Sequence, residues 1–238
     1  MTVSIEIVED PARACAALMV GAAVAGGDIV LTGGSTPRAA YEHFVEAVDQ
    51  VGIDLSQTTF WIGDERCVDP DDDRANYKMI GQSLLDPLGD RARFVRMKGE
   101  LGPEEGAADY AAALDEAGRP PFDLLLLGIG PDGHCASLFP GQASLAERER
   151  LVVGVPQAGL EPFVPRISLT LPALAAARQV VFLATGESKA AAIARAFGPD
   201  AEPDPQTPSS LLVPEARAII VLIDDGAASQ LHFTGEPQ

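Results

Sequence analysis

The residues best suited to acid–base chemistry lie two positions apart in a glycine-rich segment. Asp132 and His134 belong to the stretch Gly128–His134, which reads GIGPDGH and follows a run of four leucines. An imidazole has an unperturbed pKa of about 6.5 and can take a proton from water at neutral pH. A lone histidine is more often structural, but this one, unlike His43 or His232, is expected on a loop at a strand end. His134 is therefore the candidate base.

The same stretch formally satisfies the dinucleotide-binding pattern GxGxxG after a strand. Several features speak against that interpretation: it lies in the middle of the chain, Pro131 falls inside it, and Pro140-Gly141 interrupts any long helix after it. No acidic residue ends a next strand about 20 residues on, where the ribose would need one. We therefore expect no dinucleotide at this loop.

A second segment has the composition of an anion-binding turn. Gly33, Gly34, Ser35 and Thr36 follow an apolar strand and precede Pro37, where a helix is expected to open. Glycines allow close backbone approach, and the free N–H groups and positive dipole end of a helix suit a phosphate. The alternative is a simple turn in which Ser35 or Thr36 caps the helix, and this segment alone does not decide between the two.

Three cations stand near expected strand ends. Arg66 follows Asp64 and Glu65 after a strand that contains Trp61, and its planar fork could hold an anion, although a solvated charged loop fits the same pattern. Lys189 opens an expected helix, and Arg166 flanks an expected strand. Either could instead lie on the surface. In an open α/β sheet all of these segments meet beyond the carboxyl ends of the strands, in one crevice.

Composition excludes several classes of function. With 35 acidic and 17 basic side chains the chain carries a formal charge of -18, which argues against nucleic acid and against an anionic membrane surface. We expect no secretory signal and no spanning segment. Three widely separated cysteines indicate a reducing cytoplasm and no zinc site. The carboxylates between residues 64 and 73 single out no metal site. Cys135 is badly placed to form a Cys–His nucleophile pair with its neighbour His134, because side chains of sequence neighbours diverge. No GxSxG motif is present, so a serine-hydrolase triad lacks its usual sequence support.

The elements that must position these residues alternate along the chain. Short β-rich runs alternate with alanine-rich helical stretches, which predicts an α/β fold: an open, mostly parallel, doubly wound, Rossmann-like sheet with helices on both faces. No composition shift marks a boundary, so we expect one domain over residues 1–238. Strands are predicted at 3–8, 28–31, 59–62, 93–95, 122–127, 151–155, 180–184 and 218–223. Helices are predicted at 11–25, from 37, and at 74–85, 103–117 and 187–197.

Taken together, these motifs resemble the glucosamine-6-phosphate isomerase/6-phosphogluconolactonase family, and its lactonase branch in particular. The pieces that match, in order over residues 30–190, are LTGGSTP (31–37), WIGDERCV (61–68), NY (76–77), GIGPDGHCASLFPG (128–141), RISLTLP (166–172) and KA (189–190). Each piece is short, but the ordered set is specific.

The resemblance implies hydrolysis of 6-phospho-D-glucono-1,5-lactone without a cofactor, in the oxidative pentose phosphate pathway. His134 matches the general base that activates water, and Asp132 would orient it or stabilise its charged form. Arg66 and Lys189 match phosphate-binding positions, with Gly33–Thr36 beside them and Arg166 as a further cation. Backbone N–H groups of residues 130–133 are one option for stabilising the oxyanion. The expected partner is a small sugar phosphate; the oligomeric state stays open, and a monomer is compatible with the sequence.

Two alternatives remain. Glucosamine-6-phosphate deaminases share the fold and a similar loop, but there the segment after the histidine typically reads Asn-Glu-Pro-Gly, whereas this chain has Leu138-Phe139-Pro140-Gly141. Phe139 thus replaces a carboxylate, which disfavours ring opening and isomerisation. A non-catalytic sugar-phosphate-binding module could keep Arg66 and Lys189 without the base, and the presence of both Asp132 and His134 argues against it.

Overall fold

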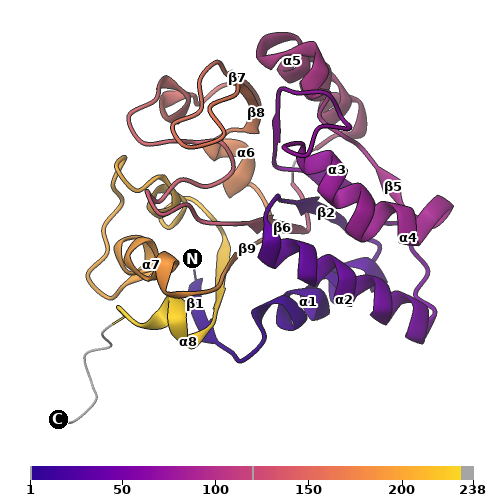
Figure 1. Ribbon diagram of the computed structural model, residues 1–238, viewed down its shortest axis with the longest axis horizontal. Helices are drawn as coiled ribbons and strands as arrows, with labels where there is room; N and C mark the ends of the chain where they lie inside the picture. The colour runs from indigo at the N-terminus through magenta and orange to yellow at the C-terminus, as the bar shows by residue number, and fades with distance from the viewer. Residues whose placement is uncertain (1, 120, 232–238) are drawn as a thin grey trace.

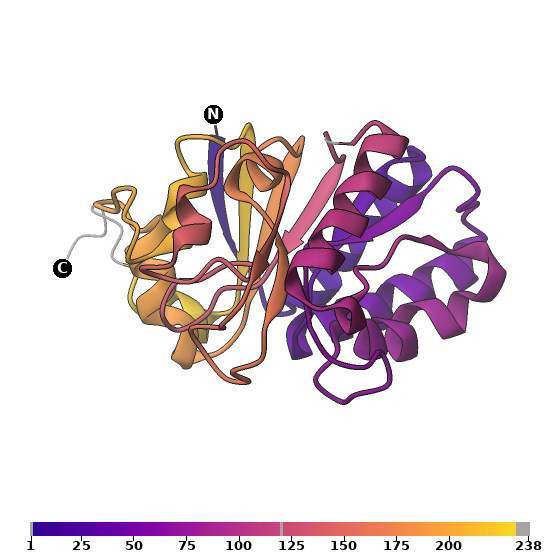
Figure 2. The same cartoon turned by 90° about the horizontal axis from the view of Figure 1, so that it is seen from above.

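Seven parallel strands form the larger sheet of the computed structural model, which describes residues 2–119 and 121–231 (Figure 1). The strands lie in the order β1-β10-β9-β6-β2-β3-β5, and the indigo β1 pairs with the yellow β10, as Figure 2 shows. Their bounds are β1 Thr2–Ile7, β2 Asp28–Leu31, β3 Thr59–Ile62, β5 Arg93–Phe94, β6 Leu124–Leu127, β9 Gln179–Ala184 and β10 Ala218–Ile223. The predicted α/β class and parallel sheet are confirmed.

Helices cover both faces of this sheet because side chains alternate along each strand. On β3, Phe60 packs against Phe44 of α2 with ring centroids 5.9 Å apart, whereas its neighbour Trp61 packs against Tyr110 of α5 at 6.1 Å. The two helices therefore lie on opposite faces. The helices are α1 Pro11–Val24, α2 Ser35–Val51, α3 Asn76–Ile80, α4 Asp86–Leu88, α5 Pro103–Ala117, α6 Leu171–Ala175, α7 Ala190–Phe197 and α8 Asp225–Ala228.

A second, antiparallel sheet was not predicted. It contains β4 (Asp64–Arg66), β8 (Arg166–Leu169) and β7 (Val152–Val155) in that order, and β7 and β8 contact α5 (Figure 1). The solvated-loop alternative for residues 64–66 is wrong, because Asp64 and Glu65 are buried in a strand. The surface alternative for Arg166 is also wrong, since this residue is buried at the start of β8.

Several predicted helices differ in detail from the observed ones. The helix after β2 begins at Ser35 rather than Pro37. The helix predicted at 74–85 is α3 followed by a π-helical turn at Gly81–Leu85, and the one at 187–197 is a 3₁₀ turn at Glu187–Lys189 followed by α7. Such turns differ from an α-helix by one residue in hydrogen-bond spacing, which the apolar periodicity does not resolve.

The order of the parallel strands reverses between β2 and β6. From β2 the chain proceeds through β3 to β5 at one edge, and from β6 it proceeds through β9 to β10 on the other side. Ligands of open α/β sheets bind at such a switch point, beyond the carboxyl ends of the strands. One hydrophobic cluster extends through the sheet from Ala12 to Ala227. Within the part of the chain that the structure describes, no helix is both long and apolar enough to cross a membrane.

Candidate functional site

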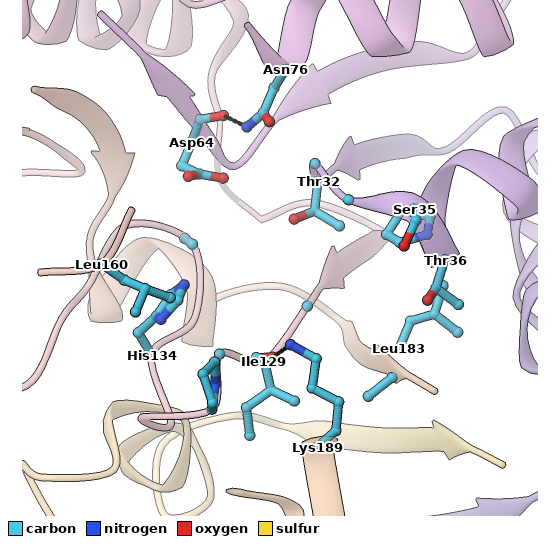
Figure 3. A pocket seen from close by; sticks show the side chains of 18 of the residues that line it. Thr32, Ser35, Thr36, Asp64, Asn76, Ile129, His134, Leu160, Leu183 and Lys189 are labelled. Carbon is cyan, nitrogen blue, oxygen red and sulfur yellow. Dashed lines mark hydrogen bonds between the residues drawn. The ribbon is translucent and has the colours of Figure 1, made fainter. Parts of the chain in front are cut away.

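A cleft of about 280 Å³ lies at the switch point, bordered by the loops that follow β2, β6 and β9 and by the β4–β8 sheet (Figure 3). Of the residues predicted from the sequence, eight line it: Gly33, Gly34, Ser35, Thr36, Arg66, His134, Arg166 and Lys189. The ninth, Asp132, contacts the cleft through His134. Residues up to about 156 positions apart in the chain thus meet where the topology places them.

Asp132 fixes the imidazole of His134. Its Oδ1 lies 2.6 Å from Nδ1 of the ring and also accepts the His134 backbone N–H at 3.2 Å. Burial alone would raise the pKa of the Asp132 carboxyl, but its hydrogen bond with the ring and the charge of His134 outweigh burial and lower that pKa. An ionised carboxylate can only accept, so Nδ1 carries the proton. The lone pair of the neutral ring is therefore on Nε2.

Two neighbours hold this pair in place. The ring of Phe139 lies 4.6 Å from that of His134, centroid to centroid, at an angle of 42°. A Cβ at Gly130 would overlap with Nδ1 of His134. Glycine is therefore required at position 130, because the His134–Asp132 pair packs directly on its backbone. After this loop the chain turns back through a bridge between Cys135 and Leu138 and forms a short 3₁₀ turn at Ala143–Ala146, in place of the long helix that the dinucleotide pattern requires.

Gly130→Ala is expected to lower kcat by about 10- to 100-fold, because a displacement of roughly 1 Å in a reacting group can cost that much. The added Cβ would push His134 and Asp132 away from their present positions. Gly21→Ala is the matched control, since a Cβ there meets open space on α1. The measurement is the steady-state kcat of wild type and of both variants with the substrate that is proposed in the next subsection. Equal turnover of Gly130→Ala and wild type would mean that the pair need not be held so closely.

The N-terminus of α2 faces the cleft without a side-chain cap. Gly34 is the N-cap residue, with φ 118°, and no side chain within residues 2–119 and 121–231 forms a capping hydrogen bond there. The capping alternative for Ser35 or Thr36 is thus wrong. The first N–H groups of a helix have no acceptor within it, so they and the helix dipole favour an anion here. Tyr41 fastens the start of the loop, since its hydroxyl donates to Thr32 O at 2.7 Å and accepts from Thr32 N at 2.9 Å.

Two arginines lie directly opposite each other in the antiparallel sheet. Arg66 of β4 pairs in register with Arg166 of β8, and both side chains reach the cleft. Burial, and next the charge of Arg66, lower the pKa of the Arg166 guanidinium. Like charges opposite each other are unfavourable. The Nε atom of Arg66 is buried without a hydrogen-bond partner among the described residues. Both observations fit a pair that is completed by an anion.

Lys189 approaches the cleft from the end of β9. Its Nζ donates to Ile129 O at 2.9 Å, which ties it to the loop that carries His134 (Figure 3). Burial lowers the pKa of the Lys189 ammonium, and the charge of Asp132 opposes this in part. Beside it, the hydroxyls of Thr36 and Thr185 are 2.9 Å apart. A cation, two hydroxyls and a helix N-terminus therefore lie along one wall.

Several polar residues of the site were not predicted from the sequence, among them Asp64, Glu65 and Asn76. Asp64 and Asn76 line the cleft, and Asn76 donates through Nδ2 to Asp64 O at 2.9 Å. Glu65 lies behind them and accepts the backbone N–H groups of Arg66, Asn76 and Tyr77 at 2.6–2.8 Å. Burial raises the pKa of Glu65 to about 7, although these hydrogen bonds lower it. The available signal was the motif DER itself, since Asp64 and Glu65 directly precede Arg66.

The loop at residues 130–133 offers fewer oxyanion donors than the sequence suggested. The N–H of Gly130 donates to His134 O and that of Gly133 to Gly130 O, both at 2.9 Å. Pro131 has no N–H. These groups are therefore not free to bind a developing oxyanion. Over residues 2–119 and 121–231, no group of three or more His, Cys, Asp or Glu side chains is arranged to hold a metal ion.

Comparison with known proteins identifies the family. The model of the family described as "Glucosamine-6-phosphate isomerases/6-phosphogluconolactonase" matches residues 6–221. A protein of Streptomyces coelicolor named 6-phosphogluconolactonase is 41% identical over 217 residues, which cover 85% of this chain and 81% of the relative. The solved structure of 6-phosphogluconolactonase from Leishmania guyanensis is 26% identical and superposes with a TM-score of 0.81, covering 98% of this chain and 100% of the other.

The fold alone does not separate the two branches of the family. A monomeric glucosamine-6-phosphate deaminase superposes with a TM-score of 0.83 at 18% identity, covering 97% of this chain and 100% of that one. The match at this level of identity concerns architecture only. The family model and the 41% identical relative together extend over most of the sequence. The chain belongs to the glucosamine-6-phosphate isomerase/6-phosphogluconolactonase family.

Proposed function

We propose that this chain hydrolyses 6-phospho-D-glucono-1,5-lactone to 6-phospho-D-gluconate, a step of the oxidative pentose phosphate pathway. The observation that carries the proposal is the cleft itself, in which the His134–Asp132 pair faces the same space as Arg66, Lys189 and the N-terminus of α2. A base and an anion site in one cleft suit a phosphorylated substrate that must be attacked by water. The lactonase relative with 41% identity supports this assignment.

His134 acts as the base through Nε2, because Asp132 occupies Nδ1. Nε2 takes a proton from water while the water oxygen forms a bond to the lactone carbonyl carbon. The tetrahedral intermediate then collapses, the bond from this carbon to the ring oxygen breaks, and the proton on Nε2 passes to that oxygen to give a hydroxyl group. The carboxylic acid so formed loses its proton to solvent. Asp132 holds the ring and stabilises its charged form.

The phosphate group binds where the positive groups gather. Lys189, the free N–H groups at residues 33–36 and the pair Arg66–Arg166 supply charge and donors around it. An acidic protein repels anions at long range, so a few local cations and backbone amides must provide the attraction. The substrate is then fixed at its phosphate end and presents its carbonyl to His134.

The charge of Lys189 makes phosphate binding depend on pH in the alkaline range. Its pKa is lowered from 10.5 by burial, so the ammonium loses its proton, and with it its attraction for phosphate, at a lower pH than an exposed lysine. The Kd for inorganic phosphate should therefore rise as the pH approaches 10.5 from below. In Lys189→Arg the guanidinium stays charged, so this rise should be absent. Calorimetric titrations across that range test this, and identical pH profiles for both proteins would contradict it.

Phe139 favours the lactonase over the deaminase reaction. The ring lies at the edge of the cleft against His134, where the deaminase motif would supply a carboxylate. An apolar ring cannot exchange the protons that ring opening and isomerisation require. The proposal therefore predicts no release of ammonia from glucosamine 6-phosphate.

Hydrolysis of freshly generated 6-phosphogluconolactone, corrected for spontaneous opening, is the direct test. The same assay on unphosphorylated gluconolactone reports the contribution of the phosphate site. Fast turnover of the phosphorylated lactone alone is the expected result. No acceleration above background would overturn the proposal, and glucosamine 6-phosphate followed by a binding assay would then separate the deaminase from a sugar-phosphate-binding module.

We further propose that residues 1–238 act as one domain in the cytoplasm. The single large hydrophobic cluster supports one domain. The three free cysteines, two of them buried, suit a reducing compartment. The sequence is compatible with a monomer. Gel filtration with light scattering measures the oligomeric state.

A further inference from the structure

The cleft contains a buried carboxylate that the proposed mechanism does not use. Asp64 is 5% exposed and lines the same space as the cations. It forms no ion pair with any residue that the structure describes, although its charge acts on nearby Arg166. A carboxylate repels a phosphate, so Asp64 must face an uncharged part of the ligand. The hydroxyl groups of a sugar are uncharged, and each can donate a hydrogen bond.

The two oxygens of this carboxylate have different surroundings. Oδ2 accepts the hydroxyl proton of Ser137 at 2.6 Å. Oδ1 has no hydrogen-bond partner within residues 2–119 and 121–231, and the carboxyl group points into the cleft (Figure 3). One oxygen is therefore held by the protein, while the other is left for a ligand.

Ser137 is built to hold Asp64 in this orientation. The serine is fully buried, and its backbone N–H donates to Ser168 Oγ of β8 at 3.2 Å. It follows Ala136, whose φ of 48° is unusual for a residue with a side chain. The turn at residues 135–138 thus aims the serine hydroxyl at Asp64 of β4, and it belongs to the loop that carries His134.

We propose that Ser137 is a positioning residue for substrate specificity: it directs Oδ1 of Asp64 toward the cleft, where that oxygen accepts hydrogen bonds from sugar hydroxyls. The inference deepens the proposed function and rests on it for the class of ligand. Two tasks are thus carried out by different residues of one cleft. The cations bind the phosphate, and the Ser137–Asp64 pair recognises the hydroxylated chain or ring.

The test compares two ligands that share a phosphate, only one of which carries sugar hydroxyls. Dissociation constants of 6-phosphogluconate and of inorganic phosphate are measured by calorimetry for wild type and Ser137→Ala. We expect the Kd of 6-phosphogluconate to rise about 3- to 10-fold in the variant, as for the loss of one or two hydrogen bonds, while the Kd of phosphate stays the same. If the role of Ser137 were only structural, its substitution would change both dissociation constants by the same factor or leave both unchanged.

A double-mutant cycle decides whether Ser137 acts through Asp64. In an Asp64→Asn background, Ser137→Ala should cause no further loss of 6-phosphogluconate affinity; an additive loss would overturn the proposal. Ser83→Ala is the matched control, because Ser83 is also buried and donates to a backbone carbonyl, Met79 O, away from the cleft. It should leave both constants unchanged. If Ser137→Ala does not fold, Ser137→Cys takes its place. The thiol is a weaker donor, so the ratio of the Kd of 6-phosphogluconate to the Kd of phosphate should rise by a smaller factor than that expected for Ser137→Ala. An unchanged ratio in Ser137→Cys would refute the proposal.

These binding measurements do not depend on turnover. If wild type binds 6-phosphogluconate but does not hydrolyse the lactone, the proposed function fails while the ratio of the two constants still tests Ser137. If wild type hydrolyses the lactone and Ser137→Ala keeps the wild-type ratio, the proposed function stands and the positioning role is wrong.

Discussion

His134→Ala should lower kcat for 6-phosphogluconolactone by about 10²–10⁴-fold, the usual contribution of a positioned general base. The variant loses the imidazole of the cleft, which Asp132 orients so that one ring nitrogen stays free. It keeps Lys189 and Arg66. The Kd for inorganic phosphate should therefore stay as in wild type, and the loss should appear in kcat. Initial rates corrected for spontaneous opening, together with phosphate titrations, provide the two measurements.

A second histidine offers a matched control. His43 lies on α2 with 25% of its side chain exposed, close to the 20% of His134, but its neighbours are Asp10 and Glu46, away from the cleft. His43→Ala should retain wild-type turnover. Equal losses of turnover and of phosphate affinity in His134→Ala would instead indicate that His134 supports the structure of the cleft and is not the base.

The parallel sheet was predictable because its inner strands are apolar and lie between clear helix signals. β2, β3 and β10 begin and end where the sequence predicts, as does α5, which Pro103 opens and Gly118 ends in the left-handed conformation. A buried parallel strand must be apolar along its whole length, so such runs are easily identified. The convergence of the predicted site residues then followed from the topology rule alone.

The antiparallel sheet was not predictable from local pattern. Its strand β4 consists of three charged residues, Asp64, Glu65 and Arg66, which taken alone indicate an exposed loop. Their burial depends on partners that are distant in sequence: Ser137 is 73 positions from Asp64, and Arg166 pairs with Arg66 across 100 positions. Such polar pairs leave no periodic signal. The contacts that bury Asp64 and Glu65 in β4 were therefore missed, although Arg66 of the same strand was predicted.

Arg66→Ala should raise the KM for the phosphorylated lactone and the Kd for inorganic phosphate by about 10- to 100-fold, because hydrogen bonds to charged groups contribute about 1.5–3 kcal/mol. Arg66 has a buried Nε without a partner among the described residues, while its Nη1 donates to Arg74 O at 2.5 Å. The guanidinium is thus held at one side and open to an anion at the other. Arg66→Lys keeps the charge but loses the planar fork, so its KM and Kd should lie between those of wild type and those of Arg66→Ala.

Arg74→Ala separates this effect from a general loss of positive charge. The Arg74 side chain is exposed and pairs with Asp72 outside the cleft, and its substitution leaves in place the carbonyl that accepts from Arg66. This variant should bind phosphate as wild type does. Unphosphorylated gluconolactone provides the second comparison, since its kcat/KM should change little in Arg66→Ala. An unchanged KM for the phosphorylated lactone would remove Arg66 from the phosphate site, and the affinity would then have to come from Lys189, Arg166 and the N-terminus of α2.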